Sequence, residues 1–496
     1  MMDTNKHLKG PYQLYINGEW RDSASGHTFD SINPATEEVI AQVAKGTGQD
    51  AEDAVNAAYS SFEKGTWAEM DKRDRERILL KAADLIETKY AEELAVRESC
   101  DAGKLLRDVR SVDVPDIANT LRYFAGWITK FDGAVKTPDG YFNNHLLGYT
   151  RREPLGVVVG ITPYNFPLIL SMTKIAPALA MGNSFIHKPA SSTPLSANTL
   201  AKVFEEAGVP PGVYNLVTGS GRDVGTVFST HSKVDKIALT GSTQTGIQIS
   251  KDAADSMKHL TMELGGKAPL VIFDDSDLDV AVQYAVMGAF WNKGEVCVAA
   301  TRIIVQNTIY EAFLEKFVEA TCQLKVGDPL DPTTDMGPMA GRGEYEKVLK
   351  YIDIGKNEDK AQLAYGGEPI KVNGKGFYVS PTIFSHATAD MRIANEEIFG
   401  PVVPVIPFDD FDEALEIANG VPFGLAAGVQ TGDSAKAVRF GEKLKAGIIW
   451  LNTWHEYDVN MPFGGYKMSG YGRERGIETL SAYTQVKSMW LKLGDK

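Results

Sequence analysis

Residues 156–242 contain four short apolar runs that are rich in β-branched side chains. They are GVVVGI at 156–161, NSFIHKP at 183–189, VYNLVTG at 213–219 and KIALTGS at 236–242. The segments between them are helix-like, for example PLSANTLAKVFEEAG at 194–208. Because strands that alternate with helices form a parallel sheet covered on both faces, this pattern predicts a doubly wound α/β unit.

A second series of the same kind begins near residue 263. Its apolar runs are APLVIF at 268–273, TRIIVQ at 301–306 and PVVPVIPF at 401–408. It predicts a second α/β unit. Upstream of both series, apolar residues recur at helical spacing between residues 50 and 99, which predicts amphipathic helices on a domain surface. Two further segments, 132–150 and 481–496, are strand-like and polar at alternate positions, which suits them to pairing across subunits.

The composition restricts the class of protein. The chain has 496 residues, 43% of them hydrophobic and 23% charged, which is typical of a globular protein with two or three domains of roughly 100 to 200 residues each. A net charge of −14 disfavours binding to nucleic acid. The apolar runs are much shorter than the roughly 20 residues that cross a bilayer, and the polar N-terminus lacks the apolar centre of a signal peptide, so we expect a cytoplasmic protein without a membrane partner.

Three cysteines, Cys100, Cys297 and Cys322, without a CxxC motif provide neither a disulfide framework nor a zinc site, and we expect no metal. Cys297 lies in FWNKGEVCVAATR, and polar neighbours with Gly294 place it on a turn. Most buried cysteines are inert apolar residues. A reactive thiolate needs a positive local potential. Since no histidine is near in the sequence, a cationic cofactor is the candidate source.

Other candidate residues have an ordinary and a functional interpretation. Glycine turns at Gly219–Gly221 and at Gly241–Ser242 follow expected strands, so each fits either a tight connection or a phosphate cradle at a helix N-terminus. Glu263 lies in an apolar stretch. It is either a general base with a raised pKa, or a helix cap or ion-pair partner of Lys267. Asn165, between two prolines, is either a turn residue or a fixed amide donor for an oxyanion.

Nine segments, taken in order, resemble the aldehyde dehydrogenase superfamily over nearly the whole chain. They are INGEW, NPATEEVI, ITPYNFP, HKPASSTP, TGSTQTG, MELGGK, FWNKGEVC, NEEIFGP and PFGGYKMSGYGRE. The resemblance implies a subunit with three parts. A Rossmann-type nucleotide-binding domain would comprise residues 1–131 and 151–262, an α/β catalytic domain residues 263–480, and a small β oligomerisation arm residues 132–150 and 481–496, which points to a homodimer or homotetramer.

The resemblance also implies roles for single residues. Cys297 matches the nucleophile and Glu263 the general base, Asn165 with the backbone N–H of Cys297 matches the oxyanion hole, and Lys174 and Glu474 match a proton relay. Candidate cofactor residues are Lys188 at the adenosine ribose, Ser242 at the pyrophosphate, Glu397 and Phe399 at the nicotinamide ribose and ring, with Gly221 and Gly241 of the glycine turns, and Ser191.

The implied reaction is the oxidation of an aldehyde to a carboxylic acid with NAD or NADP. Cys297 attacks the aldehyde, hydride leaves for the nicotinamide, and water activated by Glu263 hydrolyses the resulting thioester. Relatives that transfer the acyl group to coenzyme A typically lack this glutamate, so hydrolysis is favoured. The alternatives are a thioesterase or acyltransferase that uses Cys297 without redox chemistry, or a binding protein that has lost activity although it keeps both residues.

One departure from the family pattern and the lining of the matching substrate tunnel bear on specificity. Members strict for NAD commonly carry a glutamate at the position of Ser191, where a carboxylate would repel a 2′-phosphate, so we expect NADP to be accepted. Positions that match the substrate tunnel give an aromatic and aliphatic lining with no fixed cation: Phe166, Leu170, Trp291, Val296, Tyr457 and Phe463. This lining favours uncharged aliphatic or aromatic aldehydes. Alternatively Trp291 and Tyr457, with Glu456 nearby, host a cationic aminoaldehyde or betaine-aldehyde type of substrate.

Overall fold

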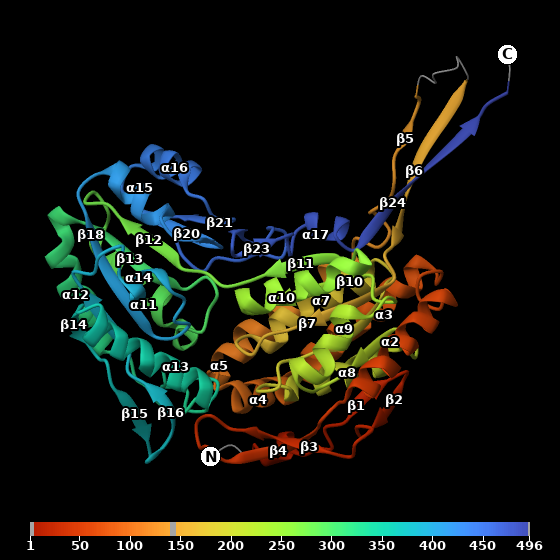
Figure 1. Ribbon diagram of the computed structural model, residues 1–496, viewed down its shortest axis with the longest axis horizontal. Helices are drawn as coiled ribbons and strands as arrows, with labels where there is room; N and C mark the ends of the chain where they lie inside the picture. The colour runs from red at the N-terminus through yellow and green to blue at the C-terminus, as the bar shows by residue number, and fades with distance from the viewer. Residues whose placement is uncertain (1–3, 139–144, 495–496) are drawn as a thin grey trace.

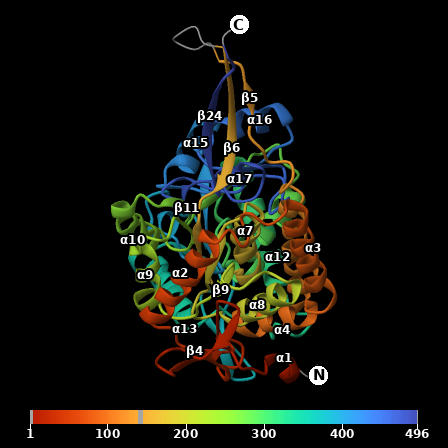
Figure 2. The same ribbon diagram turned by 90° about the vertical axis from the view of Figure 1, so that its right-hand side faces the viewer.

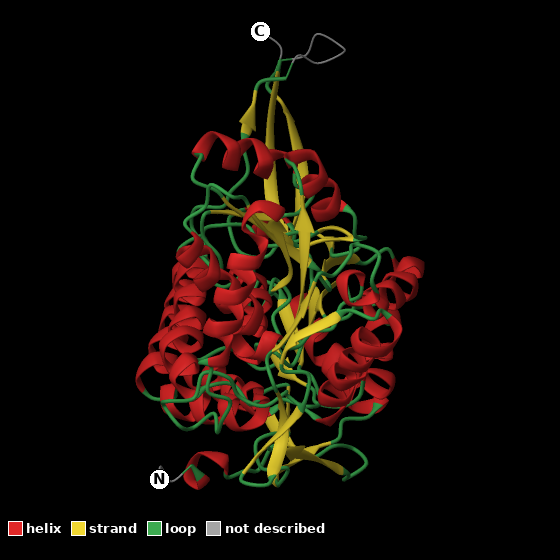
Figure 3. Cartoon of the chain, turned by 90° about the vertical axis from the view of Figure 1, so that its left-hand side faces the viewer, coloured by secondary structure: helices red, strands yellow, loops and turns green. Residues whose placement is uncertain are grey.

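The computed structural model describes residues 4–138 and 145–494, and two large sheets covered by helices dominate it (Figure 1). Viewed from the side, the strands lie in the middle of the molecule with helices on both sides (Figure 3). The predicted α/β class with a Rossmann-type unit and a second α/β unit is confirmed. No helix within the described ranges is long and apolar enough to cross a membrane.

The first sheet has the strand order β2-β1-β9-β8-β7-β10-β11-β23. Its five central strands are parallel: β9 (Tyr214–Leu216), β8 (Ser184–Lys188), β7 (Val157–Ile161), β10 (Lys236–Thr240) and β11 (His259–Glu263). Antiparallel strands form its edges: β1 (Leu14–Ile16) and β2 (Glu19–Arg21) at one side, β23 (Gly470–Tyr471) at the other. The last strand comes from the 263–480 segment that the sequence assigns to the second unit.

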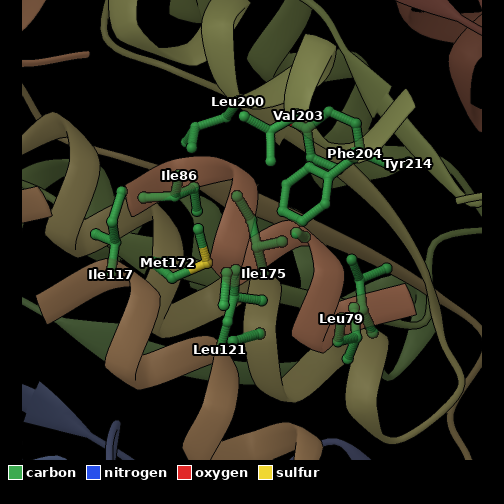
Figure 4. Packing of buried hydrophobic residues seen from close by; sticks show 14 of the residues in the cluster. Leu79, Ile86, Ile117, Leu121, Met172, Ile175, Leu200, Val203, Phe204 and Tyr214 are labelled. Carbon is green, nitrogen blue, oxygen red and sulfur yellow. The ribbon is translucent and has the colours of Figure 1, made fainter. Parts of the chain in front are cut away.

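Helices cover both faces of this sheet. One face carries α3 (Lys72–Thr88), α4 (Ala91–Ala102), α6 (Val114–Ala125), α7 (Pro167–Ala180) and α8 (Leu195–Ala207), and the other carries α2 (Gly48–Glu63), α9 (Thr226–Thr230) and α10 (Thr243–Ala253). Figure 4 shows side chains such as Leu121, Ile175 and Phe204 meeting between the helices of the first face. Each buried aliphatic or aromatic side chain contributes roughly 1.5–3 kcal/mol, so this core holds α7 firmly in place.

The second sheet has the strand order β14-β17-β18-β13-β12-β20-β21. Its parallel strands are β17 (Thr382–Ser385), β18 (Val402–Phe408), β13 (Ala300–Gln306), β12 (Ala268–Ile272), β20 (Ala426–Gln430) and β21 (Ile448–Leu451), with β14 (Gln362–Tyr365) antiparallel at one edge. Its main helices are α11 (Leu278–Phe290), α12 (Tyr310–Cys322), α13 (Arg342–Asp353), α15 (Phe411–Asn419) and α16 (Ser434–Lys443). Residues 264–267 connect β11 directly to β12, so the chain enters the second sheet through one short link, and it returns to the first sheet as β23.

A narrow three-stranded sheet projects from the body (Figures 1 and 2). It consists of β5 (Val135–Lys136), β6 (Leu146–Pro154) and β24 (Thr484–Lys492), and the last two pair antiparallel along their whole length. Strand β6 continues four residues beyond the limit of 150 that the sequence suggests for this arm. Residues 139–144 and 495–496 of the predicted arm lie outside the described residues.

Candidate functional site

The carboxyl ends of the five parallel strands in the first sheet open onto one groove of about 1010 Å³. Ligands of doubly wound sheets bind beyond the carboxyl ends of the strands, because the connecting loops and helix N-termini meet there. The second unit closes the groove from the other side. Among the residues that line it are six of the predicted cofactor residues, Lys188, Gly221, Gly241, Ser242, Glu397 and Phe399.

Two of these residues offer donors at the sheet end of the groove. Ser242 caps the N-terminus of α10, and its Oγ accepts a hydrogen bond from the backbone N–H of Thr245 at 3.2 Å. Lys188 ends β8, and burial lowers the pKa of its amine to about 8. A helix N-terminus and a buried amine suit the phosphates and ribose hydroxyls of a dinucleotide. Ser191 lies beside the groove and not in its lining, and its Oγ donates to the Gly219 carbonyl at 2.9 Å.

Glu397 forms the acidic end of the groove, and residues of the link between the sheets hold it there. The Gly266 N–H donates to Oε1 of Glu397 at 2.9 Å. A Cβ added at Gly265 would lie 2.4 Å from Oε2 of the same carboxylate, so a larger residue there would displace the Glu397 side chain. The ring of Phe399 meets that of Tyr164 edge to face, with centroids 5.9 Å apart. A carboxylate and an aromatic ring placed like this fit a ribose and a flat heterocycle, so the described groove fits a dinucleotide along its length.

Cys297 occupies a turn between α11 and β13, as the sequence suggests, and it lines two cavities. One is the groove, and the other has a volume of about 400 Å³. The turn follows three consecutive residues in the left-handed region, Asn292 (φ 47°), Lys293 (φ 52°) and Gly294 (φ 70°). Such backbone costs on the order of 1–3 kcal/mol per non-glycine residue and clusters at functional sites. Cys100 is buried within α4 and Cys322 is exposed at the end of α12, and neither lines these cavities.

Asn165 follows β7 and is buried against the turn that precedes Cys297. Its Nδ2 donates to the Glu295 carbonyl at 3.0 Å, and Asn292 Nδ2 donates to the Asn165 carbonyl at 3.2 Å. These bonds fix both the side-chain amide and the backbone of Asn165. Since a primary amide has two N–H groups, one remains for another acceptor.

The surroundings of Cys297 favour the protonated form of its thiol. Burial raises its pKa to about 12, and the negative charges of Glu263 and Glu397 act in the same direction. Because these groups disfavour the thiolate, we expect the positive potential that activates the sulfur to come with the bound cofactor.

This pKa predicts how Cys297 reacts in the cofactor-free protein. We expect alkylation by iodoacetamide to accelerate from pH 7 to pH 10 without a plateau, because the thiolate fraction grows about tenfold per pH unit below the pKa. Mass spectrometry of the peptide that contains Cys297 separates its labelling from that of Cys322. A rate that levels off near pH 8 would show that the thiol is activated without cofactor.

Glu263 is the last residue of β11, and its side chain is 3% exposed. Neither carboxylate oxygen has a hydrogen-bond partner among the described residues, and Lys267 Nζ likewise has none there, so the ion pair between the two is absent. Burial, reinforced by the charge of Glu474, raises the pKa of Glu263 well above its usual range. Glu263 lines neither cavity, and no hydrogen bond with a described residue fixes its carboxylate in one orientation.

A buried ion pair lies behind Glu263. Lys174 Nζ contacts Glu474 Oε1 at 2.6 Å and donates to Thr240 Oγ1 at 2.6 Å. The second carboxylate oxygen of Glu474 accepts from Thr173 Oγ1 at 2.7 Å. The sequence analysis gave neither threonine a role: Thr173 lies outside the quoted segments, and Thr240 is the first residue of TGSTQTG.

The smaller cavity contains all six predicted substrate residues in its lining: Phe166, Leu170, Trp291, Val296, Tyr457 and Phe463. The expectation that no fixed cation lines this cavity is wrong. Arg475 forms part of the wall, where its Nη2 pairs with Asp116 Oδ2 at 2.8 Å. The two residues are 359 positions apart, so no local pattern could reveal the pair.

The chain is therefore an α/β enzyme with a cysteine thiol between a dinucleotide-sized groove and a largely apolar cavity. The family model described as "Aldehyde dehydrogenase family" matches residues 20–489. Aldehyde dehydrogenase 1A1 of Oryctolagus cuniculus is 44% identical over 486 residues, which cover 98% of this chain and 96% of the relative. The chain belongs to the aldehyde dehydrogenase family, and it is an NAD(P)-dependent oxidoreductase that converts an aldehyde into the acid.

Solved structures agree with this assignment. Betaine aldehyde dehydrogenase of Staphylococcus aureus, in complex with NAD+, is 39% identical with a TM-score of 0.96, covering 100% of this chain and 98% of its own. The indole-3-acetaldehyde dehydrogenase of P. syringae, also in complex with NAD+, is 40% identical with a TM-score of 0.95, covering 99% and 98%.

Proposed function

We propose that Cys297 is the nucleophile of aldehyde oxidation and that Glu263 is the base that hydrolyses the acylated enzyme. The observation that carries this proposal is the position of Cys297, which borders both the groove and the apolar cavity. Its Sγ forms a bond with the aldehyde carbon while the S–H proton leaves to water and the carbonyl electron pair moves onto the oxygen. The free N–H of Asn165 and the backbone N–H of Cys297 stabilise the oxyanion. Bound NAD(P) supplies the acceptor for the hydride.

The later steps use the carboxylates. Glu263 removes a proton from water, whose oxygen bonds to the acyl carbon as the C–S bond breaks, so the acid leaves and the thiol is restored. The absence of a hydrogen bond to the Glu263 carboxylate within the described chain allows it to turn toward Cys297. Lys174 and Glu474 carry the proton onward, and their 2.6 Å contact supports this role.

In the cofactor groove we propose Lys188 at the adenosine ribose, Gly221, Gly241 and Ser242 at the pyrophosphate, and Glu397 and Phe399 at the nicotinamide end. Ser191 does not bring a carboxylate to the region proposed for the adenosine ribose. The exposed Arg222 lines the groove next to Gly221, on the side of the groove near Ser191. A guanidinium that can reach a 2′-phosphate favours NADP, so both cofactors are expected to serve.

Ser191→Glu is expected to lower kcat/KM with NADP by about 10- to 100-fold and to leave that with NAD within about threefold. The reason is repulsion between the new carboxylate and the 2′-phosphate. Steady-state kinetics with both cofactors measure the effect, and Ser191→Ala serves as the matched control without the charge. A wild-type enzyme that does not turn over with saturating NADP would contradict the proposal.

For the substrate we propose an uncharged aliphatic or aromatic aldehyde, because aromatic and aliphatic side chains form most of the cavity wall next to Cys297. The second candidate is a cationic aminoaldehyde, supported by the carboxylates of Glu456 and Asp116 beside the rings of Trp291 and Tyr457. A panel of aldehydes of both kinds, run with NAD and with NADP and followed by absorbance and product identification, separates them.

We also propose a homodimer or homotetramer assembled through the β5–β6–β24 arm. Large apolar side chains on the arm are exposed, with Val135 at 70%, Val486 at 57% and Trp490 at 64%. Exposed apolar groups on a projecting sheet are typical of an interface. The cytoplasmic location stays a prediction from the sequence.

A further inference from the structure

The wall of the substrate cavity has a polar sector as well as an apolar one. The apolar side chains next to Cys297 come from α7, the α11 end and the 457–463 segment, whereas Ser111, Asp116, Asn119 and Arg475 contribute polar groups. An aldehyde bound at Cys297 therefore meets polar side chains at the part of the wall that α6 and residue 475 provide.

Arg475 is the most constrained member of this sector. The residue is 7% exposed, and one arm of its guanidinium pairs with Asp116 at 2.8 Å. The other arm, Nη1, is buried and has no hydrogen-bond partner among residues 4–138 and 145–494. An unsatisfied donor of a charged group is costly, so this nitrogen requires an acceptor. Arg475 also lines the substrate cavity, so a substrate oxygen can approach its guanidinium from that side.

The backbone of Arg475 is held in an uncommon conformation. Arg475 has φ 56°, in the left-handed region that side chains rarely adopt. Its neighbours hold it there: Glu474 forms a β-bridge with Phe463, the Gly476 N–H donates to the Val459 carbonyl at 2.7 Å, and the Thr479 hydroxyl donates to the Arg475 carbonyl. Strained residues that their surroundings fix in this way cluster at functional sites.

The surrounding charges determine which acceptor fits. Asp116 already balances the guanidinium charge, and Glu456 adds a further negative charge to the same wall. Both carboxylates would repel a substrate carboxylate, whereas they would not repel an uncharged oxygen. We propose that Arg475 is a specificity-determining residue, which donates a hydrogen bond to an ether, hydroxyl or carbonyl oxygen on the part of the substrate away from the aldehyde carbon. This inference rests on the proposed function, since it deepens the substrate class of the same site.

Matched pairs of substrates test the inference. Methoxybenzaldehydes and ethylbenzaldehydes have nearly the same shape, but only the methoxy group accepts a hydrogen bond. With one of the ortho, meta and para pairs the wild-type enzyme is expected to favour the methoxy compound by at least about tenfold in kcat/KM, the size of a hydrogen bond to a charged donor. Arg475→Met keeps an apolar stem and removes the donors, so the preference should fall to within about twofold. The ethyl compound serves as the internal control for folding and turnover.

Three outcomes would overturn the inference: equal rates for all three pairs in the wild type, an unchanged preference in Arg475→Met, or an equal loss on both compounds in that variant, which marks a purely structural role. If Arg475→Met does not fold, Asp116→Asn provides the test, because removing the counter-charge should raise kcat/KM for 4-carboxybenzaldehyde by about tenfold, and no gain contradicts the inference. Failure of the wild type to oxidise any of these aldehydes would contradict the proposed substrate class and not the role of Arg475.

Discussion

Cys297→Ala is expected to lower kcat/KM for aldehyde oxidation by at least about 10⁴-fold, because covalent catalysis ends when the nucleophile is removed. Cys100 and Cys322 lie outside the linings of both cavities, so neither can replace it. The absorbance of the reduced nicotinamide measures the loss. Binding of NAD(P) to the variant, followed by calorimetry, should remain within about threefold of the wild type, because the groove keeps its other residues.

Cys322→Ala is the matched control for this variant. It removes an exposed cysteine at the end of α12 and should leave kcat/KM unchanged. A Cys297→Ala enzyme that keeps a tenth or more of wild-type activity would show that the reaction does not pass through this sulfur.

Glu263→Gln is expected to slow turnover by about 10²- to 10⁴-fold while the first turnover stays fast. Glutamine has the same shape as glutamate but cannot take a proton from water, so the acyl group remains on the sulfur. Rapid mixing should show a burst of one equivalent of reduced nicotinamide per subunit, followed by a slow steady state. Glu416→Gln, an exposed site on α15, should behave like the wild type.

The raised pKa of Glu263 fixes the sign of the pH dependence. A base acts when it is deprotonated, and a pKa above the usual range moves deprotonation to higher pH, so wild-type kcat should rise as pH increases through that pKa. In Glu263→Gln this rise should disappear from the slow phase. The base would have to be another group if the variant kept the wild-type profile and showed no burst.

Much of the fold follows from local patterns. The four runs between residues 156 and 242 became parallel strands because each is short, apolar and followed by a glycine or proline turn. Strands β12, β13 and β18 of the second unit are likewise short apolar runs, although Asp or Asn residues follow them and not glycine or proline. Strand β23 could not be found this way: Gly470–Tyr471 is too short to show a period, and it pairs with β11 across more than 200 residues of chain.

The candidate site likewise contains residues that local sequence patterns indicate and others that only the folded chain brings together. Cys297 and Asn165 stand out because turns and prolines around them have a local signature. Gly265 leaves room for the Glu397 carboxylate, and the Gly266 N–H donates to it. The ion pair between Arg475 and Asp116 can be seen only in the folded chain. The same is true of the pKa shifts of Cys297 and Glu263, because burial is their main cause and burial cannot be read from a local stretch of sequence.

Peptide mass spectrometry of Glu263→Gln, quenched with acid after mixing with an aldehyde and NAD(P), tests most directly whether the reaction passes through an acyl group on Cys297. We expect the peptide containing residue 297 to gain the mass of the acyl group, and hydroxylamine to remove it. The gain in mass should require the oxidised cofactor. An acyl group on any other residue, or an unmodified peptide in an enzyme that has released one equivalent of reduced nicotinamide, would contradict this expectation.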